Sequence, residues 1–139
     1  MHLHVDDDGF VRAPATDCYR VLTHVAAWPD WWPDTSVRAG TRKDHFDLVL
    51  GAGLRRIRLD VRAHGWRHDQ GFRLAVTGNL VGEVEYWLEP GWGGTVVHHL
   101  ATLEGGTRGT HGRYRRWVRQ GLWGVKDRVQ VAVLEAGAA

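Results

Sequence analysis

Few side chains of this sequence are suited to acid–base chemistry, and two of them stand at apolar positions of predicted strands. Tyr86 shares a strand face with Val84 and Leu88. His99 is the only imidazole that we expect inside the protein. An imidazole beside a phenol in an apolar pocket suits general acid–base catalysis of aldol cyclisation or dehydration. The alternative is a neutral core histidine that forms a hydrogen bond to one neighbour.

The orientation of His99 depends on the alternation of the strand around it. One face of this strand carries Thr95, Val97, His99, Ala101 and Leu103, and the other carries Val96, His98, Leu100, Thr102 and Glu104. The pattern does not separate the two faces cleanly. We expect the first set to point inward because it ends in Leu103 rather than in Glu104. His98 and His99 then point to opposite faces and do not form a chelating pair.

Other candidate chemical groups are isolated. His2 and His4 share a strand face, but the pattern supplies no third metal ligand. The Gly51–Gly53 segment is a turn rather than a phosphate loop. We therefore expect neither a metal nor a cofactor. Arg128 lies at the edge of the apolar stripe of a predicted helix, where it would meet an acidic ligand head group or extend to the surface.

The composition describes a single globular domain spanning residues 1–139, with 43% hydrophobic residues, a net charge of +2 and eight Trp. So many Trp side chains imply a large core, a ligand cavity or an interface. Cys18 is the single cysteine, which excludes an internal disulfide and favours a reducing cytoplasm. The N-terminal residues lack signal-peptide character, and the longest stretch without charge, residues 90–103, is too short to span a bilayer.

The order of predicted elements indicates an α+β fold. A strand at 2–12 precedes a short helix that Pro14 opens, with Thr16 or Asp17 as capping acceptors, and a helical turn at 30–32. Six further strands are predicted at 34–41, 44–50, 54–64, 72–77, 80–89 and 95–104. Their connections are of hairpin length, so the seven-stranded sheet should be antiparallel.

Residues 110–136 change to helical periodicity. One stripe contains Tyr114, Trp117, Val118, Gly121, Leu122, Val125, Val129, Ala132 and Val133. This long amphipathic helix should cover the apolar face of the sheet. Gly121, in the middle of the stripe, indicates either room for a ligand or a close approach of helix and sheet.

Four segments carry a family resemblance. They are Val11–Asp17 at the first helix start, Trp28–Pro33, Gly78–Gly82 followed by Trp87 and Pro90, and Gly93–Val97. In this order they resemble the START-like (SRPBCC) superfamily, which includes polyketide cyclase/dehydrase-like and lipid-transfer proteins. Asn79 stands where one bacterial branch more commonly has Asp. The resemblance implies a helix-grip fold, with the sheet wrapped around the long C-terminal helix.

The resemblance also implies a cavity between the sheet and the C-terminal helix. Its expected lining is Trp32, Phe46, Leu48, Ile57, Leu59, Val61, Leu74, Val84, Tyr86, His99, Tyr114, Trp117, Gly121, Val125 and Arg128. We expect it to bind a polyketide-like, aromatic or lipid molecule. The alternative is a cofactor-independent cyclase or dehydratase in which His99 and Tyr86 transfer protons from one shared cavity.

A third interpretation is an interaction protein. Trp123 projects opposite the apolar stripe, where it would either mark a protein or self-association interface or stack on Arg119. This interpretation predicts a small or filled cavity and an exposed Trp123. The face shared by Arg56, Arg58 and Arg62 would suit phosphate or RNA, but the small net charge leads us to expect no nucleic-acid partner. Membrane insertion is not expected.

Overall fold

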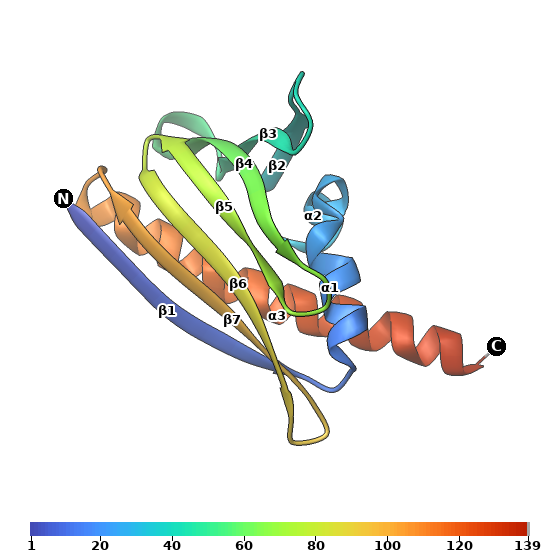
Figure 1. Ribbon diagram of the computed structural model, residues 1–139. Helices are drawn as coiled ribbons and strands as arrows, with labels where there is room; N and C mark the ends of the chain where they lie inside the picture. The colour runs from blue at the N-terminus through green and yellow to red at the C-terminus, as the bar shows by residue number, and fades with distance from the viewer. Residues whose placement is uncertain (139) are drawn as a thin grey trace.

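A computed structural model describes residues 1–138 of the chain as a curved sheet around one long helix (Figure 1). The strands are β1 (His2–Val11), β2 (Thr35–Ala39), β3 (His45–Leu50), β4 (Ile57–Arg67), β5 (Gly71–Gly78), β6 (Val81–Gly91) and β7 (Gly94–Glu104). The α-helices are α1 (Ala15–Thr23), α2 (Trp28–Trp31) and α3 (Arg108–Ala138), and the 3₁₀ turns are Val25–Ala27 and Gly53–Arg55.

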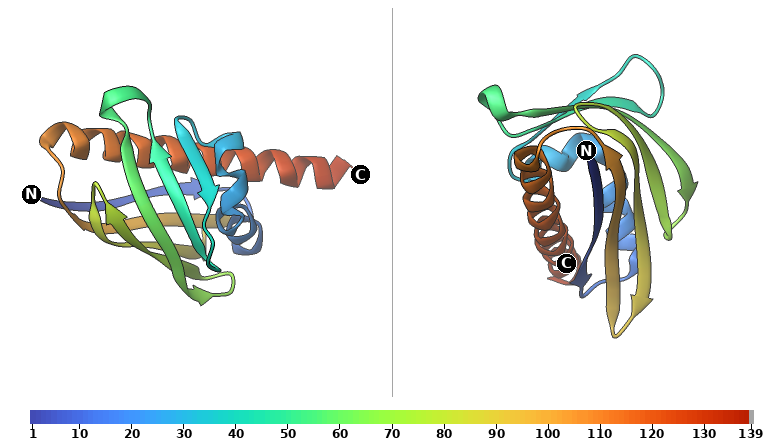
Figure 2. Two further views of the ribbon diagram at one scale, coloured as in Figure 1. Left: turned by 90° about the horizontal axis from the view of Figure 1, so that it is seen from above. Right: turned by 90° about the vertical axis from the view of Figure 1, so that its left-hand side faces the viewer.

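The seven strands form one antiparallel sheet in the order β1-β7-β6-β5-β4-β3-β2. Figure 2 shows the sheet curling around α3, with α1 and α2 filling one end of the concave side. The predicted α+β helix-grip architecture is confirmed, including the two short helices between the first and second strands. The concave face of the sheet is therefore the inner face, and the convex face is the outer face.

Strand alternation decides which side chains reach the core. In β4 the apolar Ile57, Leu59 and Val61 are buried, whereas the intervening Arg58 and Asp60 are exposed. Alternation of this kind keeps one face of an antiparallel sheet in contact with water and covers the other. The inner side chains of all the central strands join the apolar side of α3 in one core.

Several predicted boundaries and contacts are wrong. The fourth strand begins at Ile57 rather than at residue 54, because Gly53–Arg55 forms a 3₁₀ turn. The first helix begins after Pro14, which is its N-cap, and no side chain caps it. Proline has no side-chain acceptor, and Thr16 and Asp17 lie inside the helix rather than at its N-cap. The expected capping role of Thr16 or Asp17 is therefore absent.

The end of the predicted helical stripe is also wrong. At about 1.5 Å per residue, α3 is about 46 Å long and extends past the sheet (Figure 2). Ala132 and Val133 are exposed there instead of buried, because no strand lies opposite them. Within the described part of the chain, no helix is both long and apolar enough to cross a membrane.

Candidate functional site

The inner face brings three polar aromatic side chains together in the core. His99 on β7 is 1% exposed, and its Nε2 lies 2.8 Å from the hydroxyl of Tyr114 on α3. The Tyr86 ring on β6 meets the His99 ring edge to face, with centroids 4.9 Å apart. Tyr86 and His99 are direct cross-strand partners, so the sheet register fixes this contact. The expected inward orientation of His99, chosen because its strand face ends in Leu103, is confirmed, but the bond to Tyr114 depends on how α3 is rotated.

The second ring nitrogen of His99 has no partner. Nδ1 is buried and forms no hydrogen bond to any part of the chain that the structure describes. Donation by the Tyr114 hydroxyl to Nε2 leaves one unmet polar group, the Nδ1–H. If Nε2–H donated to the Tyr114 hydroxyl instead, both Nδ1 and the hydroxyl hydrogen would lack a partner. Because each unmet buried group costs about 1–3 kcal/mol, we assign the tautomer with hydrogen on Nδ1.

Burial keeps all three groups neutral. Desolvation lowers the pKa of His99 from its ordinary value of 6.5 to about 3. Desolvation also raises the pKa of the Tyr86 and Tyr114 hydroxyls well above the ordinary value. At neutral pH the group therefore offers an uncharged N–H donor in an apolar environment.

Tryptophan side chains fill much of the space beside this group. The indole of Trp32 stacks on that of Trp117 with centroids 3.8 Å apart. Trp32 Nε1 donates to the Trp117 carbonyl at 2.8 Å, and Trp117 Nε1 donates to Thr35 Oγ1 at 2.8 Å. A buried indole N–H needs such a partner, so the stack is fixed at both ends.

Gly121 makes room for the same stack. A Cβ at this position would overlap ring atoms of Trp32. Gly124 makes similar room for Trp31, whose carbonyl oxygen would lie 2.6 Å from an added Cβ. The two glycines therefore permit a close approach, but the partner is α2 and the following Trp32 rather than the sheet.

The predicted lining residues divide into two groups. All of them except Arg128 are buried between the inner face of the sheet, Trp32 and α3. Arg128 is exposed and lines a separate surface groove with His24, Trp31 and Glu135. The structure does not bring Arg128 to the others, because this turn of α3 lies against residues of α1 and α2 rather than against the sheet.

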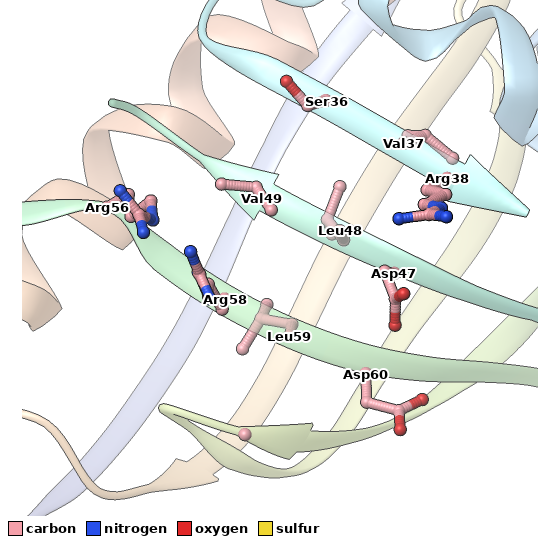
Figure 3. A pocket seen from close by; sticks show the side chains of 11 residues that line it. Ser36, Val37, Arg38, Asp47, Leu48, Val49, Arg56, Arg58, Leu59 and Asp60 are labelled. Carbon is pink, nitrogen blue, oxygen red and sulfur yellow. The ribbon is translucent and has the colours of Figure 1, made fainter. Parts of the chain in front are cut away.

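An open hollow lies on the outer face instead. It has a volume of about 570 Å³ and is open to solvent (Figure 3). Its lining is Ser36, Val37, Arg38, Asp47, Leu48, Val49, Arg56, Arg58, Leu59, Asp60 and Gly78. Figure 3 shows Arg56 and Arg58 at one end and Asp47 and Asp60 toward the other. Asp47 and Asp60 are cross-strand partners, and neither forms an ion pair within residues 1–138.

A smaller hollow of about 170 Å³ opens beside Trp117. Its lining is Asp34, Leu50, Gly51, Ile57, Arg113, Arg116, Trp117 and Gln120. Two of the predicted lining residues, Ile57 and Trp117, also line this hollow. Arg113 and Gln120 were not predicted, because their helix positions are polar and the pattern does not show that a strand end lies opposite.

Known structures share this fold. TTHA0849 from Thermus thermophilus is 19% identical with a TM-score of 0.79, over 93% of this chain and 98% of that one. The Zhui aromatase/cyclase from Streptomyces sp. R1128 is 19% identical with a TM-score of 0.64, over 96% of each chain. The chain has the START-like helix-grip fold. The di-domain aromatase/cyclase StfQ of the steffimycin biosynthetic pathway is 16% identical with a TM-score of 0.71, over 96% of this chain and 52% of that one.

No family sequence model matches the chain, and no curated protein sequence matches it.

The remaining predicted positions of this START-like fold lie on its surface. Trp123 is 60% exposed on α3. Arg119 forms an ion pair with Asp7 of β1. His98 stacks on Trp87 on the outer face, with centroids 4.4 Å apart. Among the described residues, no group of three or more His, Cys, Asp or Glu side chains is arranged to hold a metal ion.

Proposed function

We propose that this protein binds a hydrophobic small molecule, of aromatic, polyketide-like or lipid character, between the inner face of the sheet and α3. The observation that carries the proposal is the unpartnered Nδ1 of His99, buried among Tyr86, Tyr114 and apolar side chains. A buried donor without a partner costs free energy, and a ligand acceptor would remove that cost. Apolar sites with one or two polar groups are typical of small-molecule binding.

The chemistry of the three groups suggests the polarity of the ligand. The Nδ1–H donates, so the ligand presents a carbonyl, ether or hydroxyl oxygen to His99. Apolar and aromatic side chains, among them Trp32 and Trp117, surround the three groups and would contact the rest of the molecule. Polyketides and aromatic ketones combine both features, and the similarity to two aromatase/cyclases supports this class.

The low pKa of His99 favours a binding role for this side chain over a catalytic one. A group whose pKa is about 3 is a weak base at neutral pH and removes protons poorly from a carbon acid. Tyr86 and Tyr114, with raised pKa values, are correspondingly weak acids. A cyclase or dehydratase in which His99 and Tyr86 transfer protons is the alternative, and it requires the ligand to bring the pKa of His99 close to neutrality.

Native mass spectrometry tests the proposal. The protein purified from its own host should carry a bound hydrophobic molecule, which denaturing extraction then releases for identification. The substitution His99→Leu should lower the bound fraction, whereas His98→Leu, one residue away on the outer face, should leave it unchanged. A ligand-free mass, or equal occupancy in the two variants, contradicts the proposal.

A second candidate role is contact with another protein through the Trp123 face. A Trp side chain that is 60% exposed supports it, as does the filling of the inner space by Trp32 and Trp117. Trp123→Ala should weaken any association measured by analytical ultracentrifugation or affinity capture. The same variant should retain ligand in the native mass spectrum, which separates the two roles.

A further inference from the structure

The small hollow beside Trp117 combines buried apolar surface with two arginines. Ile57, Leu50 and Trp117 form its floor and are each no more than 5% exposed. Arg113 and Arg116 stand at its rim, three residues apart on α3. Ile57 and Trp117 also belong to the predicted lining of the inner site, so this hollow adjoins that site.

Arg113 has a polar atom that the protein leaves unmet. Its Nε is buried and forms no hydrogen bond within the described chain. Neither Arg113 nor Arg116 forms an ion pair with any side chain of residues 1–138. Burying a guanidinium N–H without an acceptor is costly, whereas an oxyanion would accept hydrogen bonds from two of its nitrogens together.

The helix is shaped to hold the Arg113 head group in this position. Gly109 lies one turn earlier, and a Cβ there would sit 3.1 Å from Arg113 Nη1. Gly109 stands in the first turn of α3 and has no Cβ, so the Arg113 guanidinium fits beside it. The guanidinium therefore lies back along α3, beside Gly109.

The charge of the hollow favours an anion. Asp34 places one carboxylate on the rim against the two guanidiniums, which leaves a net charge of +1. The Gln120 amide adds a further donor. The volume of about 170 Å³ corresponds to about five or six water molecules, enough for a carboxylate or phosphate with its first few carbons.

We infer that the ligand of this protein is an amphipathic anion, whose oxyanion group is bound by Arg113 and Arg116 while its apolar part extends past Trp117 toward the inner site. This inference rests on the proposed function and adds the charge of the ligand. Carboxylates and phosphates share the chemistry that the two guanidiniums recognise.

Two fluorescent probes of nearly the same shape test the inference. Anilinonaphthalenesulfonate carries one anionic group, and phenylnaphthylamine is its neutral counterpart. The protein should bind the sulfonate about tenfold more tightly or better, because charge-assisted hydrogen bonds are worth at least that factor. Arg113→Gln and Arg116→Gln should each reduce this preference, and the double substitution should abolish it. Arg115→Gln, an equal charge change at an exposed position of the same helix, should preserve it.

The outcomes separate the inference from the proposed function. Equal affinity for both probes overturns the inference, as does a preference for the sulfonate that survives the double substitution. Neither outcome contradicts the proposed apolar site, since phenylnaphthylamine still binds. Failure of both probes to bind overturns both. Circular dichroism and thermal unfolding of each variant establish that it is folded before its affinities are compared.

Competition then identifies the oxyanion. Decanoate and decyl phosphate, below their micelle concentrations, should displace the sulfonate probe, and the stronger competitor identifies carboxylate or phosphate as the preferred group. Decanol, which has the same chain and no charge, should compete at least tenfold more weakly. Equal displacement by decanol overturns the inference.

Discussion

The two faces of the sheet present opposite kinds of candidate site. The outer face has an open hollow of about 570 Å³, but its charged side chains are exposed to solvent. On the inner face, Trp32 and Trp117 stack on each other and fill space beside the polar group. Yet within residues 1–138 only the inner face holds a buried imidazole with an unmet nitrogen. Polar groups removed from water discriminate between ligands more strongly than groups that water already satisfies, so volume alone does not identify the site.

The largest expected effect on the inner face is a pH dependence. The folded protein holds His99 neutral down to a pKa of about 3, whereas the unfolded chain binds a proton below about pH 6.5. Above pH 6.5 His99 is neutral in both states, so the free energy of unfolding is not reduced. Below pH 6.5 the free energy of unfolding falls by about 1.4 kcal/mol per pH unit, because only the unfolded chain binds the proton. By pH 4 the loss reaches about 3 kcal/mol.

Urea denaturation at several pH values measures this loss, with His99→Leu as the reference. Subtracting the variant removes the contributions of the other histidines, whose titration both proteins share. Parallel pH profiles of the wild type and the variant would show that His99 is not held neutral, and would contradict the account of the inner face.

The next effect concerns the glycine under the Trp stack. Gly121→Ala should destabilise the protein by about 1–3 kcal/mol, because the new methyl group overlaps the Trp32 ring. Gly112→Ala is the matched control, since no atom beyond the adjoining residues and helix backbone lies within 4 Å of the position that its Cβ would take. It should stabilise the helix by up to about 1 kcal/mol. Equal shifts in the denaturation midpoint of the two variants would mean that Trp32 does not occupy this space.

A smaller effect sharpens the description of the polar group itself. Tyr114→Phe removes the hydroxyl that satisfies His99 Nε2 and should cost about 1–2 kcal/mol of stability. The double variant His99→Leu/Tyr114→Phe removes both partners and should be less destabilised than the two single losses added together. Additive losses in urea titrations would show that the two side chains are not coupled.

The smallest effects belong to the outer face. Asp47→Asn or Asp60→Asn relieves repulsion between directly opposed carboxylates and should raise stability by about 0.2–0.5 kcal/mol. Neither substitution should change the affinity for phenylnaphthylamine. A clear loss of probe affinity in either variant would move the binding site to the outer hollow.

Most of the architecture follows from the sequence. The alternation in β4 and the helical stripe of α3 are local patterns, so the faces of Val61 and Tyr114 are readable one residue at a time. The length of the helix is readable as well, but its projection past the sheet is not. Exposure of Val133 depends on where the strands end in space, which sequence periodicity does not encode.

The site is only partly readable for the same reason. Parity places Tyr86 inward, and the inward choice for His99 rested on Leu103 at the end of its strand face, but the bond from Tyr114 requires the rotation of α3 relative to β7. The meaning of Gly121 depends on Trp32, which is distant in sequence and approaches from a different element. Arg113 occupies an unremarkable polar helix position until the end of β3 and the start of β4 are placed opposite it.

The central claim is that ligand binds on the inner face, beside His99. The most direct test is a crystal structure of the protein saturated with phenylnaphthylamine. We expect electron density for the probe in contact with His99, Tyr86 or Tyr114, with the Trp32–Trp117 stack adjacent or displaced. Density confined to the outer hollow, over Asp47 and Arg58, would contradict the claim.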